Sequence, residues 1–164
     1  MKRRLIVMRH AKSSWSHAQL TDHERPLNKR GRRDAPQVAS FLKNEGWIAQ
    51  RVISSTSQRT RETWDLMSPI WNHPPAEFTR ALYLAGSSEV REALLSQDSA
   101  TSIMILGHNP GWSEVSSWLS GLRIEMTTAN AVLLSVEAGT WREAFEQAGS
   151  WTLHDVIRPR EITP

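Results

Sequence analysis

Residues 5–12 read LIVMRHAK, a run of four apolar residues that ends abruptly in an arginine and a histidine. Such a short apolar run, with basic residues on both sides, is typical of a strand buried on both faces of a parallel sheet. In an open α/β sheet the carboxyl ends of the strands form the edge of the ligand crevice. Arg9 and His10 would therefore bring a fixed positive charge and an imidazole to that crevice, although two such residues can also simply close a strand.

Predicted helices and strands alternate along the rest of the chain. Helices are predicted over residues 29–45, 57–71, 89–97 and 112–119, with Asn28, Ser57 and either Ser87 or Ser88 as N-caps. Apolar runs typical of strands lie at residues 51–55, 101–106, 131–137 and 152–157. Residues 13–26 are expected to be a loop, 76–83 a strand or a loop, and 141–148 stay undecided. The alternation predicts an α/β fold, a three-layer sandwich with a mainly parallel central sheet flanked by helices.

The composition is that of an ordinary globular protein. The chain has 164 residues, of which 39% are hydrophobic and 23% charged, so we expect a single domain over residues 1–164. No apolar run approaches the roughly 18 residues of a membrane span, and no signal-peptide core follows Met1, so a cytoplasmic protein without a membrane partner is expected. The lack of cysteine excludes disulfides and thiolate chemistry. A net charge of +3, spread along the chain, is too weak to indicate a nucleic-acid partner.

Two further polar segments follow predicted strands. Residues 54–63 read SSTSQRTRET, a hydroxyl-rich turn into a helix with Arg59 in its first turn, and residues 107–111 read GHNPG. Helix N-termini present unpaired N–H groups to anions, and arginine forks match phosphate oxygens. Two arginines and two histidines at one crevice would neutralise a phosphoryl dianion and place an imidazole beside it. The pattern alone does not establish that these segments meet.

These motifs resemble those of the histidine phosphatase superfamily, which has the phosphoglycerate-mutase-like fold, and in particular the small SixA-type phosphohistidine phosphatases. The family's motifs correspond here to Arg9-His10-Ala11, Arg25-Pro26-Leu27 with Gly31, the turn at residues 54–63, and Gly107-His108-Asn109-Pro110. Each motif is weak by itself, but all occur in the family's order. The resemblance therefore implies both the fold and a phosphatase activity.

The resemblance also implies a role for individual residues. His10 would be the nucleophile that forms a phosphohistidine enzyme, Arg9 and Arg59 would hold the phosphate oxygens, and His108 would stabilise charge during transfer. Phosphoryl transfer depends mainly on positioning and charge neutralisation, so these groups would suffice with no metal and no cofactor. Further candidates for substrate binding are Arg25, Ser16 and Asn109.

Departures from the family pattern bear on the substrate. Ala11 replaces a glycine, and Leu84 stands where many close relatives have a glutamate that would serve as the general acid. An alkoxide leaving group needs a proton, whereas an imidazole leaves near neutrality, so the missing acid favours P–N bonds such as phosphohistidine. The short segments between motifs also suit an open pocket for a phosphotransfer domain or carrier protein. The remaining candidates for an acid are Asp22, Glu24 and Glu89.

The main hypothesis is a metal-independent protein phosphohistidine phosphatase of signal transduction. A small-molecule phosphomonoesterase on the same fold is the nearest alternative. A phosphate- or phosphoprotein-binding module with little turnover is another, to which Ala11, Ser16 and Leu84 give some weight. A metal hydrolase is disfavoured because no acidic ligand cluster accompanies the histidines. Structural roles are expected for His17, His23, His73 and His154, whose spacing makes no convincing zinc site.

Overall fold

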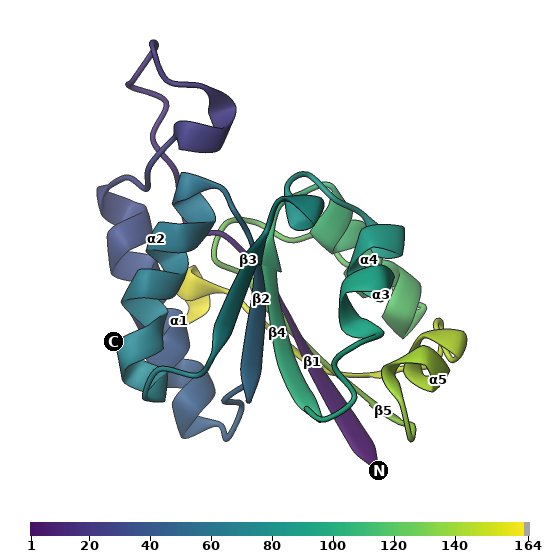
Figure 1. Cartoon of the computed structure of the whole chain (residues 1–164). Helices are drawn as coiled ribbons and strands as arrows, with labels where there is room; N and C mark the ends of the chain where they lie inside the picture. The colour runs from purple at the N-terminus through teal and green to yellow at the C-terminus, as the bar shows by residue number, and fades with distance from the viewer. Residues whose placement is uncertain (163–164) are drawn as a thin grey trace.

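In the computed structural model, which describes residues 1–162, the first apolar run forms strand β1, Lys2–Arg9, inside a six-stranded sheet (Figure 1). The strand order is β3-β2-β4-β1-β5-β6, and β1, β4, β2 and β3 are parallel to one another. β5 is antiparallel to β1, and β6 is antiparallel to β5. The other strands are β2 Arg51–Ser55, β3 Ala76–Thr79, β4 Ser102–Gly107, β5 Ala131–Glu137 and β6 Thr152–Ile157.

Helices cover both faces of this sheet (Figure 1). On one face lie α1, Lys29–Asn44, and α2, Gln58–Met67, which continues as a 3-10 turn over Ser68–Trp71. On the other lie α3, Ser87–Leu94, α4, Gly111–Ser120, and α5, Trp141–Glu146. The predicted three-layer α/β class is therefore confirmed. None of the described helices is long and apolar enough to cross a membrane. Short 3-10 turns complete the chain: η1 Asp22–Glu24, η3 Arg80–Leu82 and η4 Pro159–Glu161.

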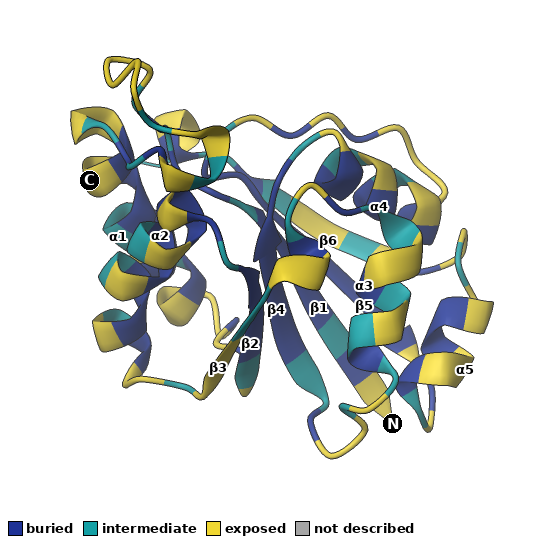
Figure 2. Cartoon of the chain, turned by 45° about the horizontal axis from the view of Figure 1, so that its top comes forward, coloured by how far each residue is buried: buried dark blue, intermediate teal, exposed yellow. Residues whose placement is uncertain are grey.

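The alternation of side chains along β1 divides the interior into two hydrophobic cores. Leu5 and Val7 pack into the core beneath α3, α4 and α5, while Ile6 and Met8 pack into the core beneath α1 and α2. All four side chains are fully buried, as expected for a central strand whose neighbouring residues point to opposite faces. Figure 2 shows this burial along the central strands β1 and β4 and the exposure of the outward faces of the helices.

Register brings the two histidine motifs together. Arg9 of β1 lies opposite Gly107 of β4, so His10 and His108 leave neighbouring parallel strands at the same sheet edge. The backbone N–H of His10 donates to the carbonyl of Gly107 at 3.0 Å, which fixes this alignment. The meeting of the motifs thus follows from the parallel pairing of the strands that precede them.

Most predicted elements are confirmed, and the differences have local causes. The side chains of Asn28 and Ser57 cap α1 and α2 as predicted, by accepting from the N–H groups of Gly31 and Thr60. The predicted N-cap of the third helix is wrong, because Gly86 occupies that position instead of Ser87 or Ser88. Its N–H donates to the Glu89 carboxylate at 2.8 Å, and α3 begins with Ser87.

The loop prediction for residues 13–26 is correct for most of that segment but missed η1. Thr21 and Glu24 form a capping box around this short turn, in which the Thr21 N–H donates to the Glu24 carboxylate at 3.1 Å. The segment 76–83 divides into β3 and η3, and the undecided segment 141–148 contains α5. Between β1 and α1 the chain projects beyond the carboxyl edge of the sheet (Figure 1), and η1 returns it to the first turn of α2.

Candidate active site

The ring of His10 is held in one orientation by its own backbone neighbourhood. Its Nδ1 lies 2.7 Å from the carbonyl oxygen of Ala11. A carbonyl only accepts hydrogen bonds, so Nδ1 carries the proton and the neutral ring presents an unprotonated Nε2. Arg59 donates from its Nε to this Nε2 at 3.4 Å. The imidazole therefore directs its Nε2 lone pair toward Arg59, into the space that the two side chains share.

Burial keeps His10 neutral. The residue is 5% exposed, and this burial, together with the positive charges of Arg59 and Arg9 and the proximity of His108, lowers the pKa of His10 well below its usual 6.5. The hydrogen bond to Ala11 opposes this effect but does not outweigh it. A neutral imidazole is the form that can act as a nucleophile.

The backbone after His10 accepts the Cβ of Ala11 without strain. Ala11 is fully buried, and its N–H donates to Oγ1 of Thr63 at 3.0 Å. That hydroxyl in turn donates to the carbonyl of Arg59 at 2.7 Å. A short chain of hydrogen bonds thus ties the end of β1 to the first turns of α2, which carry Arg59.

His108 faces the same arginine through its other nitrogen. Nη2 of Arg59 lies 3.3 Å from Nδ1 of His108, and because a guanidinium only donates, Nδ1 accepts. The proton of His108 is then on Nε2, which lies 2.8 Å from Oγ of Ser55. Burial and the nearby Arg59 lower the pKa of His108 to about 3. The two rings, with centroids 5.3 Å apart, are both neutral.

Asp22 supplies the negative charge opposite Arg59. Its Oδ2 accepts from Nη2 of Arg59 at 3.0 Å and from the hydroxyl of Tyr83 at 2.5 Å, and its Oδ1 accepts from Arg25. Burial by itself would raise the pKa of Asp22, but the hydrogen bonds from Tyr83, Arg59 and Arg25 lower it to about 2. Asp22 is therefore ionised near neutrality and is a poor proton donor there.

Arg9 has a polar atom that the fold leaves unsatisfied. Its Nη1 makes a long contact of 3.4 Å to the carbonyl of Met126, while its buried Nε finds no hydrogen-bond partner among residues 1–162. Burial and the charge of Arg59 lower the pKa of Arg9. Buried N–H groups without partners are rare and costly, and those at functional sites fit a bound acceptor. A phosphoryl oxygen is such an acceptor.

These side chains line a pocket of about 300 Å³ at the carboxyl edge of the sheet. Two arginines and two imidazoles surround a space in which a dianion would meet donors on several sides. Leu84 lies on its rim, 59% exposed and with φ of 54°, a backbone conformation that residues with a large side chain rarely adopt. The lining consists of Arg9, His10, Lys12, Ser13, Trp15, Asp22, Arg25, Arg59, Leu84, His108, Asn109 and Thr128.

The three further candidates for substrate binding differ in how they lie relative to the pocket. Arg25 lines the pocket, stacks over Trp15 at 3.5 Å and donates to Oγ of Ser13 at 2.7 Å. Asn109 also lines it, but its amide supports α4 by accepting from Ser113. Ser16 lies outside the lining, exposed and bonded to its neighbour Ser14.

Neither glutamate proposed as an acid lines the pocket. Glu24 is exposed, and Thr21 holds its carboxylate in the capping box. Glu89 caps α3 and faces a different hollow. Among the described residues, Asp22 is thus the one carboxylate in the lining.

Comparison of the sequence with models of known protein families identifies the family of this chain. The model of the histidine phosphatase superfamily (branch 1) matches residues 5–82, which include His10 and Arg59. The chain belongs to the histidine phosphatase superfamily. A chloroplast protein of Arabidopsis thaliana, itself uncharacterised, is 38% identical over 172 aligned residues, which cover 97% of this chain and 79% of that protein.

Solved structures of the superfamily show the same fold. The SixA protein from Nakamurella multipartitia has a TM-score of 0.84 and 23% identity, with 97% of each chain covered. The protein histidine phosphatase SixA in complex with tungstate has a TM-score of 0.80 and 21% identity, covering 96% of this chain and 97% of that one. The phosphoglycerate-mutase-like architecture implied by the sequence motifs is therefore confirmed.

Three residues that the sequence did not single out individually contribute contacts to this candidate site. Ser55 contacts His108, Thr63 contacts the backbone of Ala11, and Tyr83 bonds Asp22 while its ring meets that of His108 edge-on at 5.4 Å. The two hydroxyl residues lie in the segment 54–63 that the sequence singled out as hydroxyl-rich, so a signal for them existed. Tyr83 is adjacent to Leu84, and nothing in its local pattern indicated a polar role.

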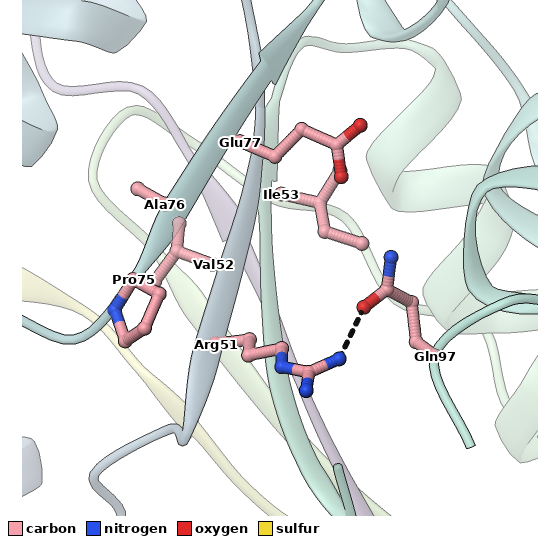
Figure 3. Close-up of a pocket in the computed structure, with 7 residues that line it drawn as sticks. All are labelled: Arg51, Val52, Ile53, Pro75, Ala76, Glu77 and Gln97. Atoms are coloured by element: carbon pink, nitrogen blue, oxygen red, sulfur yellow. Dashed lines mark hydrogen bonds between the residues drawn. The ribbon is translucent and has the colours of Figure 1, made fainter. Parts of the chain in front are cut away.

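Among the described residues no metal-binding cluster is present, and a hollow at the edge of the sheet adds nothing to this candidate site. Over residues 1–162 no three histidine or acidic side chains gather closely enough to hold a metal ion. A hollow of about 240 Å³ near the β2–β3 edge contains no histidine (Figure 3). In it Arg51, the first residue of β2, donates to Gln97 at 2.9 Å. This hollow therefore lies toward the other end of the strands from His10.

Proposed function

We propose that this protein is a phosphatase that transfers the phosphoryl group of a phosphohistidine-containing protein to Nε2 of His10 and then to water. The observation that carries the proposal is the orientation of His10, whose Nδ1 proton is held by Ala11 while its unprotonated Nε2 points toward Arg59. The neighbouring guanidinium of Arg9, with its unpartnered Nε, supplies a second set of donors.

The first step forms one P–N bond and breaks another. Nε2 of His10 attacks phosphorus while the bond between phosphorus and the substrate ring breaks. That ring carries a proton on its other nitrogen and leaves as neutral imidazole with the electron pair. Arg9 and Arg59 neutralise the charge on the equatorial oxygens, the main requirement in phosphoryl transfer. A dianion beside His108 raises the pKa of that ring, which favours a proton on Nδ1 and a hydrogen bond to a phosphoryl oxygen.

The second step returns the enzyme to its starting state. Water attacks the phosphorus of phosphorylated His10, the bond to Nε2 breaks with its electron pair returning to the ring, and inorganic phosphate leaves with both protons of the water. Because Nδ1 keeps its proton, the leaving group is again a neutral imidazole, whose conjugate acid has a reference pKa of about 6.5, so neither step needs a strong acid. The same ring therefore serves both as nucleophile and as leaving group.

The charge state of Asp22 supports a P–N substrate. An alkyl phosphate would need a proton on its departing oxygen, and the pocket offers, among residues 1–162, the carboxyl of Asp22 alone. With a pKa of about 2 that group holds no proton to donate near neutrality. A phosphomonoesterase on this fold would depend on Asp22, whereas a phosphohistidine phosphatase would not use it as an acid.

The rim of the pocket supports a protein substrate. Trp15 is 74% exposed and Leu84 59% exposed, and both line the pocket mouth. Exposed apolar side chains at the edge of a polar site are typical of surfaces that contact another protein. The SixA structure with tungstate, an oxyanion like phosphate, is a structural relative and adds support to an anion site in this fold.

Turnover of a phosphohistidine carrier protein, compared with turnover of alkyl phosphate monoesters, tests the proposal. We expect a higher kcat/KM on the carrier, and an Asp22→Asn variant that does not acquire a selective defect on the monoester. Faster hydrolysis of alkyl monoesters, lost in Asp22→Asn, would instead establish a phosphomonoesterase. Binding of the carrier without release of phosphate would identify a binding module.

A further inference from the structure

A second, strongly basic hollow adjoins the pocket of His10. It has a volume of about 310 Å³ and shares Arg9, Lys12 and Thr128 with the catalytic pocket. Arg30 of α1 and the C-terminal Arg158 and Arg160 complete its charged lining. The two hollows are therefore adjacent and share a wall at the end of β1.

The same hollow continues along α1. A third hollow, of about 380 Å³, shares Arg30 and Arg160 with it and adds Arg33. We call the two outer hollows the basic groove, lined by the cationic residues Arg9, Lys12, Arg30, Arg33, Arg158 and Arg160. With volumes of about 310 and 380 Å³, its two hollows offer more space than a single phosphate would need.

The positive charge of the basic groove is largely uncompensated. Asp34 is the one carboxylate that lines it within residues 1–162, and this buried side chain is already shared between Arg30, at 3.5 Å, and Arg33, at 3.3 Å. Six cations thus face one acid here, although the whole chain has a net charge of only +3. Such a concentration of one sign attracts anionic partners and raises their association rate.

Arg158 shows that part of this groove is held in place. Its Nη1 donates to Oδ1 of the buried Asn130 at 2.6 Å, and its Nη2 donates to the carbonyl of Glu125 at 3.2 Å. Both acceptors are uncharged oxygens, so these contacts fix the guanidinium without pairing it with a carboxylate. An arginine ordered in advance loses little conformational entropy when it meets a carboxylate.

We propose that the basic groove binds an acidic segment next to the phosphohistidine of the protein substrate. This inference rests on the proposed function and narrows its substrate class to phosphoproteins with aspartate or glutamate close to the phosphorylated residue. The shared wall with the catalytic pocket, the volume of the groove and the exposed apolar rim at Trp15 and Leu84 favour a polypeptide over a small polyanion.

Two peptides with a non-hydrolysable phosphonate analogue of phosphohistidine provide the probe. One carries aspartate and glutamate beside the analogue, and the other carries asparagine and glutamine at the same positions. Affinities for the full-length protein are measured by calorimetry at several salt concentrations. The variants are Arg30→Gln/Arg160→Gln and, to spare the contact with Asp34, Arg160→Gln alone.

A matched control removes the same charge elsewhere. Arg91 on α3 and Arg142 on α5 belong to the opposite face of the sheet (Figure 1), so Arg91→Gln/Arg142→Gln lowers the net charge equally without touching the groove. We expect the wild-type protein to bind the acidic peptide about fivefold more tightly, with a preference that falls as salt rises. The groove variants should reduce that preference in proportion to the charge removed, and the control should keep it.

The outcomes separate this inference from the proposed function. Equal binding of both peptides, or a preference that the groove variants retain, would overturn the acidic-segment proposal. So would tighter, groove-dependent binding of an alkanediol bisphosphate than of the acidic peptide, which would indicate a small-molecule substrate. The peptides are not hydrolysed, so their affinities test the basic groove independently of turnover. A phosphohistidine carrier that is not turned over would contradict the proposed function alone.

Discussion

His10 and His108 occupy equivalent places on neighbouring parallel strands, yet their surroundings differ. The Nδ1 of His10 meets a backbone carbonyl, which can only accept, so its proton cannot move to the other nitrogen without losing that bond. The Nε2 of His108 meets the hydroxyl of Ser55, which can either accept or donate. One ring is therefore fixed as a lone-pair donor, and the other can change its protonation to suit the phosphoryl group.

The largest effect is expected from removing the fixed ring. His10→Ala should lower kcat/KM by at least ~10³-fold, because the nucleophile has no substitute, and should abolish an acid-labile ³²P-phosphoenzyme. The exposed His17 lies outside the lining, and His17→Ala is the matched control, with activity near that of the wild type. A labelled adduct that persists in His10→Ala would show that the two rings have been assigned the wrong way round.

Removing the adaptable ring should have a smaller effect. His108→Gln should lower kcat by about 10²-fold, the usual loss of one preorganised donor to developing charge, while a labelled adduct at His10 still forms slowly. Rapid-quench measurement of adduct formation would separate this variant from His10→Ala. If both variants lost the adduct completely, the contrast between the two histidines would not hold.

Ser55 should act through His108 as a positioning residue. Ser55→Ala removes the partner of Nε2 and should lower kcat about tenfold with little change in KM, because substrate contacts are kept. Ser55→Thr restores a hydroxyl and should recover most of the activity. A defect of equal size in both variants would indicate only a packing role for this position.

The low pKa values of both rings should also affect stability. In the unfolded chain a histidine binds a proton near pH 6.5, whereas folded His108 does so only near pH 3, so the unfolded state holds more protons between these values. The free energy of unfolding should thus fall as pH drops below 6.5, by about 2 kcal/mol for His108 by pH 5, and the lowered pKa of His10 acts in the same direction. Urea titrations at pH 7.5 and pH 5 would measure this, and His108→Gln should weaken the dependence.

The sequence predicts elements better than it predicts partners of side chains. Apolar runs and caps located β1, β2, β5 and β6 and the start of α1, since burial and capping act over a few residues. The contact between Arg59 and Asp22, by contrast, joins residues 37 positions apart through η1, a turn that apolar periodicity does not reveal.

The site residues show the same difference between local signals and long-range contacts. The resemblance to the family's motifs predicted Arg9, His10, Arg59 and His108, which lie where strands end or a helix begins, and the structure brings them to one pocket. Ser16 was proposed by its place in a motif, but it lies outside the pocket lining and its hydroxyl bonds to that of Ser14. Contacts with Ala11 and Ser55 decide which nitrogen of each histidine faces the pocket, and only the folded chain shows those contacts.

Asp22 has a consequence for the end of the catalytic cycle. Its carboxylate already contacts the guanidinium of Arg59, so inorganic phosphate must share that arginine with an anion that belongs to the protein. In the proposed mechanism the retention of product would thereby be weakened, because a covalently tethered competitor regains its place whenever the phosphate moves off. The loop that carries Asp22 would thus help to clear the pocket between turnovers.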